Sequence, residues 1–271
     1  MKKNIYFEDL DGLRGVASAM VMFYHFALAF TLNNNPEYAF LFNFFSFKEK
    51  GGVIAVDFFF VLSGFLISYL LFVERNKTGK INIPHFYIRR VLRIWPLYFL
   101  TLFLGFVFYP YIKHLQGWDV IEYANPLMCY LFLANFDLIN NAPPSVGILG
   151  VHWSVSVEEQ FCLFWPVLFV LIMMVNRKVF PFVLVVFYLF SEIYIYLNGT
   201  AFGITYFHTI SCIRFLSVGC LIGYLSFYYL EHVKKILAFI PRYIVLFLYL
   251  LFIFIVFFEF LFSNLLCGQT F

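Results

Sequence analysis

The stretch GVIAVDFFFVLSGFLISYLLFV, residues 52–73, decides the fold. It is a long apolar run in which Asp57 is the one charged residue. A helix that crosses a bilayer needs about 20 predominantly apolar residues in a row. Residues 15–32, 94–112 and 243–262 are apolar to a similar degree. The sequence therefore predicts an all-α fold, a polytopic helical bundle embedded in a membrane.

The composition supports the same fold class. Hydrophobic residues make up 63% of the chain and charged residues 12%, whereas soluble domains are about half apolar and about a quarter charged. The net charge of +3 comes mostly from short basic loops, so we expect membrane lipids and no nucleic acid as partners. The cysteines form no CxxC pair and no metal-ligand spacing, and we predict no metal site and no bound cofactor.

We expect about seven membrane spans in one domain covering residues 1–271. Residues 127–138 are apolar but too short to cross a bilayer upright, so we interpret them as re-entrant or interfacial. The number of spans rises to eight if this segment crosses. The predicted spans are residues 11–32, 52–73, 94–112, 153–175, 179–197, 210–230 and 243–262.

The basic residues set the predicted orientation, because Lys and Arg in short loops stay on the cytoplasmic side. Lys2 and Lys3 place the N-terminus in the cytoplasm, and the loop at 74–93 follows two spans later on the same side. No cleavable signal peptide is evident. We expect an integral protein of the inner, or plasma, membrane of a bacterium.

Ionisable residues inside spans are costly, which makes each a candidate for function. Arg14 and His25 lie on one face of the first span, about 16 Å apart along the helix axis. A neutral imidazole can take and return a proton near neutral pH, which favours His25 as a general base. The alternatives are an Arg14 side chain that reaches the membrane surface and a His25 packed against a neighbouring helix.

The stretch HWSVSVEEQFCLFWP, residues 152–166, carries Glu158 and Glu159 into the outer half of the membrane. Adjacent helical residues point about 100° apart, so at most one of the two carboxylates can face His25. We predict that Glu158 orients His25 as in a general-base dyad. Glu159 is better interpreted as hydrogen-bonded to nearby serine hydroxyls or water.

The stretch FYIRRVLRIWPLY places Arg89, Arg90 and Arg93 at the cytoplasmic mouth of the 94–112 span. Guanidinium groups bind phosphate oxygens in a bidentate manner, so the cluster can be a phosphate clamp. The alternative is a purely topological role for the positive charge. Pro96 is expected to break or kink the helix just above the cluster.

Further polar positions lie in the 52–73 and 210–230 spans. Gly64 predicts close helix packing, and Ser63 has no base beside it in sequence, so we do not interpret it as a nucleophile. Arg214 needs an acid or a cavity within the membrane, and Glu158 and Glu159 are its candidate partners.

Four stretches, in this order and spacing, resemble the membrane-bound acyltransferase-3 family, and a fifth matches more weakly. They are LDGLRGVASAMVMFYHF (10–26), VDFFFVLSGFLIS (56–68), FYIRRVLRIWPLYFL (86–100), HWSVSVEEQFCLFWP (152–166) and, more weakly, RFLSVGCLIGY (214–224). The resemblance implies an enzyme that moves an acyl group, usually acetyl, from cytoplasmic acyl-CoA to a hydroxyl of a cell-surface or lipid-linked carbohydrate.

The family pattern also implies roles for individual residues. His25 would be the catalytic base, and Glu158 would support it or the acceptor. The positions that would serve the CoA phosphates or the acyl path are Arg14, Arg89, Arg90 and Arg93, and the supporting positions would be Asp11, Asp57, Ser63, Trp153 and Arg214. Family domains usually have more spans than this chain, so we expect the chain to lack the C-terminal helices of the family.

Two mechanisms and two rival functions stay open. His25 either deprotonates a sugar hydroxyl that attacks the thioester directly or carries the acyl group itself. An inactive or partial family member is one rival, and a proton-coupled transporter is the other. The absence of an inverted sequence repeat disfavours the transporter.

Overall fold

The computed structural model describes residues 12, 14–15, 17–19, 21–22, 50–199, 201–239, 241, 243–244, 246–247 and 250. Every regular element in these residues is a helix, which confirms the predicted fold class. The chain divides into two units, one of residues 60–227 and one of residues 1–59 and 228–271. The unit of residues 60–227 holds the features from which we build a site.

Five helical segments in the described part of the chain are long and apolar enough to cross a membrane. They are Val53–Thr78, Ile83–Leu115, Gly147–Val175, Val179–Leu197 and Phe202–Tyr228. They correspond to the five predicted spans that begin at residues 52, 94, 153, 179 and 210. The two remaining predicted spans, 11–32 and 243–262, lie largely outside the described residues.

Helices α3 (Lys50–Thr78) and α4 (Ile83–Phe103) form a hairpin with a short turn. Gly79 adopts a φ of +72°, which an L side chain rarely tolerates, and it ends α3. The Asn82 side chain then accepts a hydrogen bond from the His85 backbone N–H at 3.0 Å and caps α4. Pro84 in the first turn of α4 reinforces this start.

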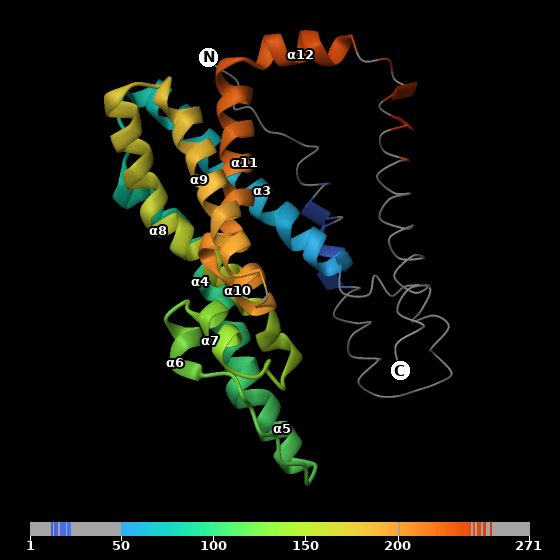
Figure 1. Ribbon diagram of the computed structural model, residues 1–271. Coiled ribbons are helices and arrows are strands. Elements are labelled where there is room, and N and C mark those ends of the chain that lie inside the picture. The colour runs from blue at the N-terminus through green and yellow to red at the C-terminus, as the bar shows by residue number, and fades with distance from the viewer. Residues whose placement is uncertain are drawn as a thin grey trace. The chain divides into compact units, whose positions relative to one another are not determined.

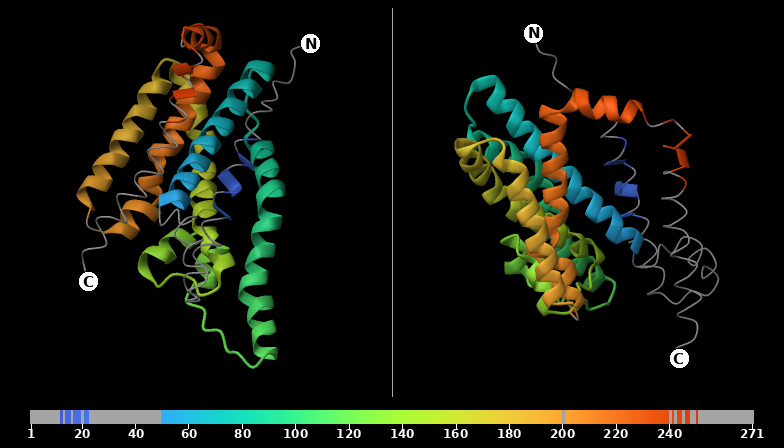
Figure 2. Two further views of the ribbon diagram at one scale, coloured as in Figure 1. Left: turned by 90° about the vertical axis from the view of Figure 1, so that its right-hand side faces the viewer. Right: turned by 45° about the horizontal axis from the view of Figure 1, so that its top comes forward.

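Helix α4 is longer than predicted, because it begins at Ile83 rather than near residue 94. It continues through the π-helix η2 (Leu104–Phe108) into α5 (Tyr109–Leu115), and Figure 2 shows the three segments as one rod. Pro96 lies inside α4 without ending it, so of the expected break or kink, the break is wrong. Arg89, Arg90 and Arg93 therefore lie within the helix, two to three turns after its start.

The core of this unit is aromatic and joins α3, α8 (His152–Val175), α9 (Val179–Leu197) and α11 (Thr209–Tyr228). Figure 1 shows α8, α9 and α11 alongside one another. The ring centroid of Phe72 lies 4.7 Å from that of Phe169 and 5.0 Å from that of Phe180. Trp165 is fully buried and donates to the Ser68 hydroxyl at 3.0 Å.

Glycines bring α3 and α11 into backbone contact. A Cβ atom on Gly64 would collide with the Leu216 carbonyl group, and one on Gly219 with the Val61 carbonyl group. Gly223 continues the same seam one turn along, against the Phe65 carbonyl oxygen. The close packing predicted for Gly64 is confirmed, and Gly219 and Gly223 supply the small residues on the partner helix.

The segment 127–138 does not form one helix. It contains most of α6 (Pro126–Tyr130) and most of α7 (Ala134–Asn140), separated by Phe132 with a φ of +56°. Neither helix can cross a bilayer, in agreement with the expected re-entrant or interfacial segment. The 3₁₀ helix η3 (Gly147–Val151) leads into α8, and α10 (Phe202–Phe207) precedes α11.

Polar side chains hold the α6–α7 segment in place. The Gln160 amide of α8 donates to the Phe132 carbonyl at 2.7 Å and to Asn135 Oδ1 at 2.8 Å. Asn135 in turn donates to the Phe207 carbonyl at 3.2 Å, and Thr209 donates to Gln160 Oε1. Because these groups are mutually satisfied, they tie α7 to α8 and α11 at little desolvation cost.

Candidate functional site: a polar helix interface and a basic hairpin

Helices α4 and α8 face each other through polar side chains. An ion pair joins Arg90 Nη1 to Glu158 Oε1 at 3.0 Å, and the two side chains are only 15% and 23% exposed. The Tyr87 hydroxyl donates to the Leu163 carbonyl on the same interface. Charges at membrane depth are tolerated when they pair with one another, so the guanidinium and the carboxylate hold α4 against α8.

The polar contacts continue along the interface from this ion pair. Trp95 Nε1 donates to Glu159 Oε2 at 3.2 Å. The Tyr98 hydroxyl donates to the Cys129 carbonyl at 2.7 Å, and Thr101 Oγ1 lies 3.0 Å from the ring nitrogen Nε2 of buried His152. The Arg90–Glu158, Trp95–Glu159 and Thr101–His152 contacts form the α4–α8 polar interface, whereas the Tyr98 hydroxyl joins α4 to Cys129 of α6.

Glu159 differs from the other members of this interface. Its Oε1 atom is buried and has no hydrogen-bond partner among the described residues. The hydrogen bond from Trp95 replaces the expected bonds to local serine hydroxyls, because Ser154 and Ser156 donate to the carbonyls of Val151 and His152.

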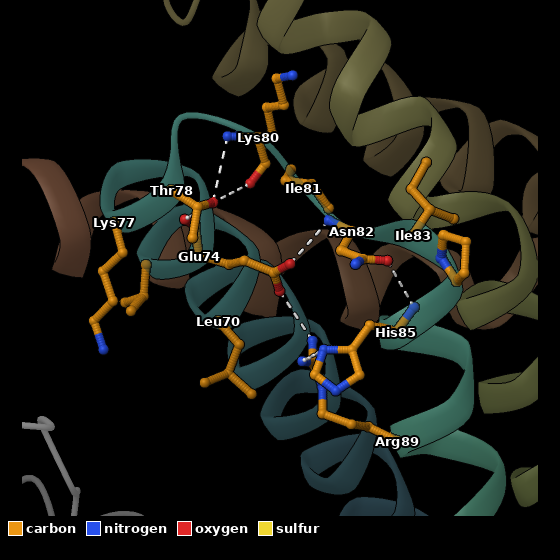
Figure 3. A pocket seen from close by; sticks show the side chains of 12 residues that line it. Leu70, Glu74, Lys77, Thr78, Lys80, Ile81, Asn82, Ile83, His85 and Arg89 are labelled. Carbon is orange, nitrogen blue, oxygen red and sulfur yellow. Dashed lines mark hydrogen bonds and ion pairs between the residues drawn. The ribbon is translucent and has the colours of Figure 1, made fainter.

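A second feature is a cavity of 1010 Å³ at the turn between α3 and α4. Figure 3 shows the side chains that line it. Three are cationic, one is a carboxylate and one is a histidine, namely Lys77, Lys80, Arg89, Glu74 and His85. We call this cavity the hairpin pocket. Its positive balance is suited to an anionic ligand.

Arg89 lies at the wall of the hairpin pocket and is 48% exposed. Its Nη2 donates to Glu74 Oε2 at 2.9 Å, and its Nη1 lies 2.7 Å from His85 Nδ1. A guanidinium has donors only, so His85 accepts at Nδ1 and carries its proton at Nε2. Glu74 Oε1 accepts from the Asn82 backbone N–H at 2.9 Å, and Figure 3 shows this carboxylate between its two donors.

The structure gives different surroundings to the three arginines that the sequence analysis treated as one cluster. Arg90 is paired with Glu158 and Arg89 with Glu74. Because Arg90 and Glu158 are in contact, they lie at the same depth, so the prediction of Arg90 at the cytoplasmic mouth and Glu158 in the outer half of the membrane is wrong for one of the two. Arg93 is exposed and has no ion pair within the described ranges. Only Arg89 of the three lines the hairpin pocket.

Several predicted site residues lie outside the unit of residues 60–227. His25 and Asp11 are not among the described residues, so the pairing of His25 with Glu158 stays a prediction. Arg14 and Asp57 belong to the other unit, where each is partly buried.

Two of the predicted supporting residues, Trp153 and Ser63, pack within the helical bundle. Trp153 is buried, and its ring packs edge-on against Phe60 and Phe207, with centroids 6.1 Å and 4.9 Å away. Ser63 is partly buried on α3, next to the glycine seam.

The partner expected for Arg214 is wrong. Its guanidinium donates to Glu192 Oε1 on α9 at 3.4 Å, and neither Glu158 nor Glu159 is its partner. Arg90 and Trp95 of α4 already bind those two glutamates. Glu192 of the neighbouring helix α9 supplies the negative charge.

Sequence reasoning also missed Glu74 and His85. Both lie within the basic stretch 74–93, and an acid at the start of a cationic stretch is a detectable signal for an internal ion pair. The four described cysteines are buried and form no disulfide. Burial raises the pKa of the Cys129 thiol from 9.0 to about 12, and Asp137 and Glu122 act in the same direction.

The chain matches a family model over almost its whole length. The acyltransferase-3 model, described as an acyltransferase domain, matches residues 7–269. The peptidoglycan O-acetyltransferase OatA of Listeria monocytogenes is 30% identical over 169 residues, which cover 59% of this chain and 24% of OatA. No solved structure matches the chain.

Two further relatives carry provisional assignments in their names. YrhL of Bacillus subtilis strain 168, provisionally a peptidoglycan O-acetyltransferase, is 30% identical over 181 residues, or 64% of this chain and 25% of YrhL. A provisional O-acetyltransferase of Staphylococcus aureus strain COL is 29% identical over 188 residues, or 65% of this chain and 27% of that protein. The chain thus spans about a quarter of the length of these relatives.

Proposed function

Because the chain belongs to the acyltransferase-3 family, we propose that it is a membrane O-acetyltransferase. It takes an acetyl group from cytoplasmic acetyl-CoA and transfers it to a hydroxyl of a carbohydrate. The names of OatA and YrhL favour a peptidoglycan-type glycan as the acceptor. The observation that supports the donor site is the hairpin pocket, whose lining includes Arg89, Lys77 and Lys80.

The hairpin pocket is suited to the phosphorylated nucleotide end of CoA. Its volume of 1010 Å³ lies at the upper end of the roughly 300–1,000 Å³ of typical small-molecule sites. Lys77, Lys80 and Arg89 provide charge for several phosphate groups, and Arg89 can bind one of them with two parallel hydrogen bonds. The positive charge of residues 74–93 supports a position of this pocket at the cytoplasmic surface, the side on which acyl-CoA is available.

The second arginine has a different role in this proposal. Arg90 is held by Glu158 inside the α4–α8 interface, so it positions α4 rather than binding phosphate. With α4 fixed, Arg89 stays one residue before this anchor and faces the pocket. Arg93 remains a candidate for the acyl path, because an exposed guanidinium in a span is costly without a ligand or a polar neighbour.

The chemical step follows from the reacting groups. The sugar hydroxyl oxygen forms a bond to the acetyl carbonyl carbon as the thioester C–S bond breaks, and His25 takes the hydroxyl proton. That proton leaves with the CoA thiolate, which restores neutral His25. A base placed in this way contributes about 10²–10⁴ to the rate. Glu158 supports the step through the anchor it makes with Arg90, and its predicted contact with His25 would add orientation.

The donor site is tested by binding of acetyl-CoA to the purified chain in detergent. Arg89→Gln removes the charge at the pocket wall, and we expect binding to weaken by at least about tenfold, as for loss of a charge-assisted phosphate contact. The matched control is Lys234→Gln, which removes a cation from α12 (Leu230–Ala238), where Lys234 pairs with Glu231 at 3.2 Å. Equal affinity in Arg89→Gln and the parent would show that the donor binds elsewhere.

A further inference from the structure

The hairpin pocket contains its own anion. Glu74 is only 19% exposed, and its carboxylate occupies the Arg89 Nη2 donor at 2.9 Å. Its other oxygen accepts from the Asn82 backbone N–H at 2.9 Å. The cation that we assign to the donor phosphate is therefore already neutralised by a side chain of the pocket.

A phosphate group that binds Arg89 must compete with this carboxylate. Carboxylate and phosphate bind the same edge of a guanidinium, and two anions that share it repel each other. The second Glu74 bond is independent of Arg89, so the carboxylate can give up the guanidinium and keep Asn82. Thr78 supports this arrangement, because its hydroxyl donates to the Glu74 carbonyl at 2.9 Å and keeps the last turn of α3 closed.

From this geometry we propose that Glu74 is an internal competitor that sets the affinity of the hairpin pocket for phosphate-bearing ligands. The inference rests on the proposed donor site. A ligand with one phosphate gains little binding free energy from Arg89, because it only replaces one anion on this side chain by another. A ligand with several phosphates also engages Lys77 and Lys80, which favours the nucleotide part of acyl-CoA over free phosphate.

The central variant is Glu74→Gln in the full chain. The glutamine amide oxygen can still accept from the Asn82 N–H, so the hairpin contact is kept while the negative charge is removed. The probe is adenosine 3′,5′-bisphosphate, which carries two phosphates on the nucleoside found in CoA. We expect Glu74→Gln to bind it about tenfold more tightly than the parent, and inorganic phosphate to gain by a similar factor, because both ligands bind Arg89.

A double-mutant cycle with Arg89→Gln isolates the competition. Without Arg89 there is no shared donor, so Glu74→Gln should have less than a twofold effect in that background. Glu74→Ser is a second charge-removing variant and is also expected to tighten binding, which separates loss of charge from any effect of the new amide. Glu231→Gln on α12 is the matched control, since it removes a carboxylate from the Lys234 pair and should leave binding unchanged.

The outcomes distinguish this inference from the proposed function. If Arg89→Gln weakens binding but both Glu74 variants match the parent, the donor site stands and the competitor role is refuted. If the parent and both Glu74 variants fail to bind the probe, and the variants melt at the same temperature as the parent, then both the donor site and the competitor role are refuted. If both Glu74 variants bind more tightly and this gain disappears when Arg89 is also replaced, the result supports both the donor site and the competitor role of Glu74.

Discussion

Replacing Glu158 by leucine should destabilise the protein strongly, and replacing Arg90 as well should restore it. In the single variant, the Arg90 guanidinium loses the carboxylate that lies 3.0 Å away and is left in a helix interface at membrane depth. In the Arg90→Leu/Glu158→Leu double variant, two apolar side chains meet instead. Replacing a buried ion pair by apolar groups is often neutral or stabilising, whereas removing one partner is not.

The expected size follows from the burial of the pair. Both side chains are less than a quarter exposed, and breaking a buried pair costs about 3–5 kcal/mol. A neutral hydrogen bond between membrane helices averages about 0.6 kcal/mol. Tyr87→Phe removes such a bond, to the Leu163 carbonyl, and is therefore the matched control on the same interface.

Unfolding of the purified chain in mixed micelles gives the free energies for this cycle. Glu158→Leu should lose several times more stability than Tyr87→Phe, and the double variant should recover to within about 1 kcal/mol of the parent. The reasoning is refuted if Glu158→Leu is as stable as Tyr87→Phe, or if the double variant is no more stable than the worse single variant.

Three further predictions concern other parts of the unit of residues 60–227. Gly219→Leu should cost at least about 1–3 kcal/mol, because its side chain would enter the backbone of α3; Gly203→Ala, whose Cβ would have ordinary contacts, should leave the melting temperature unchanged. Gln160→Leu leaves buried partners unsatisfied, at about 1–3 kcal/mol, and limited proteolysis should cleave within residues 116–146 faster than in the parent. The pKa of Cys129 near 12 keeps its thiol protonated, so iodoacetamide at pH 8.5 should alkylate it only after denaturation, and alkylation of the folded chain would contradict the burial.

Apolar patterning predicted the existence of the helices because each span must be long and uncharged. The start of α4 was placed too late, since Arg89, Arg90 and Arg93 lower the hydropathy of its first turns. The local signal for the true start was nevertheless present, because Asn82 followed by Pro84 is a cap with a proline in the first turn. Capping chemistry located this helix end better than hydropathy did.

The partners of the buried charges could not be predicted from the sequence. Which glutamate meets Arg90 depends on the rotation and register of α8 against α4, and a periodic pattern fixes neither. Arg214 was assigned to the wrong acids for this reason, although Glu192 was visible in the neighbouring span. Gly64 was predictable as a close contact because a missing Cβ is a local property, but its partner Leu216 was not.

Acetyl transfer is the measurement that tests the central proposal most directly. Membranes that contain the chain are given radiolabelled acetyl-CoA and peptidoglycan oligosaccharides, and base-labile label in the carbohydrate fraction is counted. We predict label with the parent, a loss of about 10²–10⁴-fold with His25→Ala and reduced label at low donor concentration with Arg89→Gln. Equal label from the parent and His25→Ala, or no label from an inserted and folded parent, would contradict the proposed enzyme.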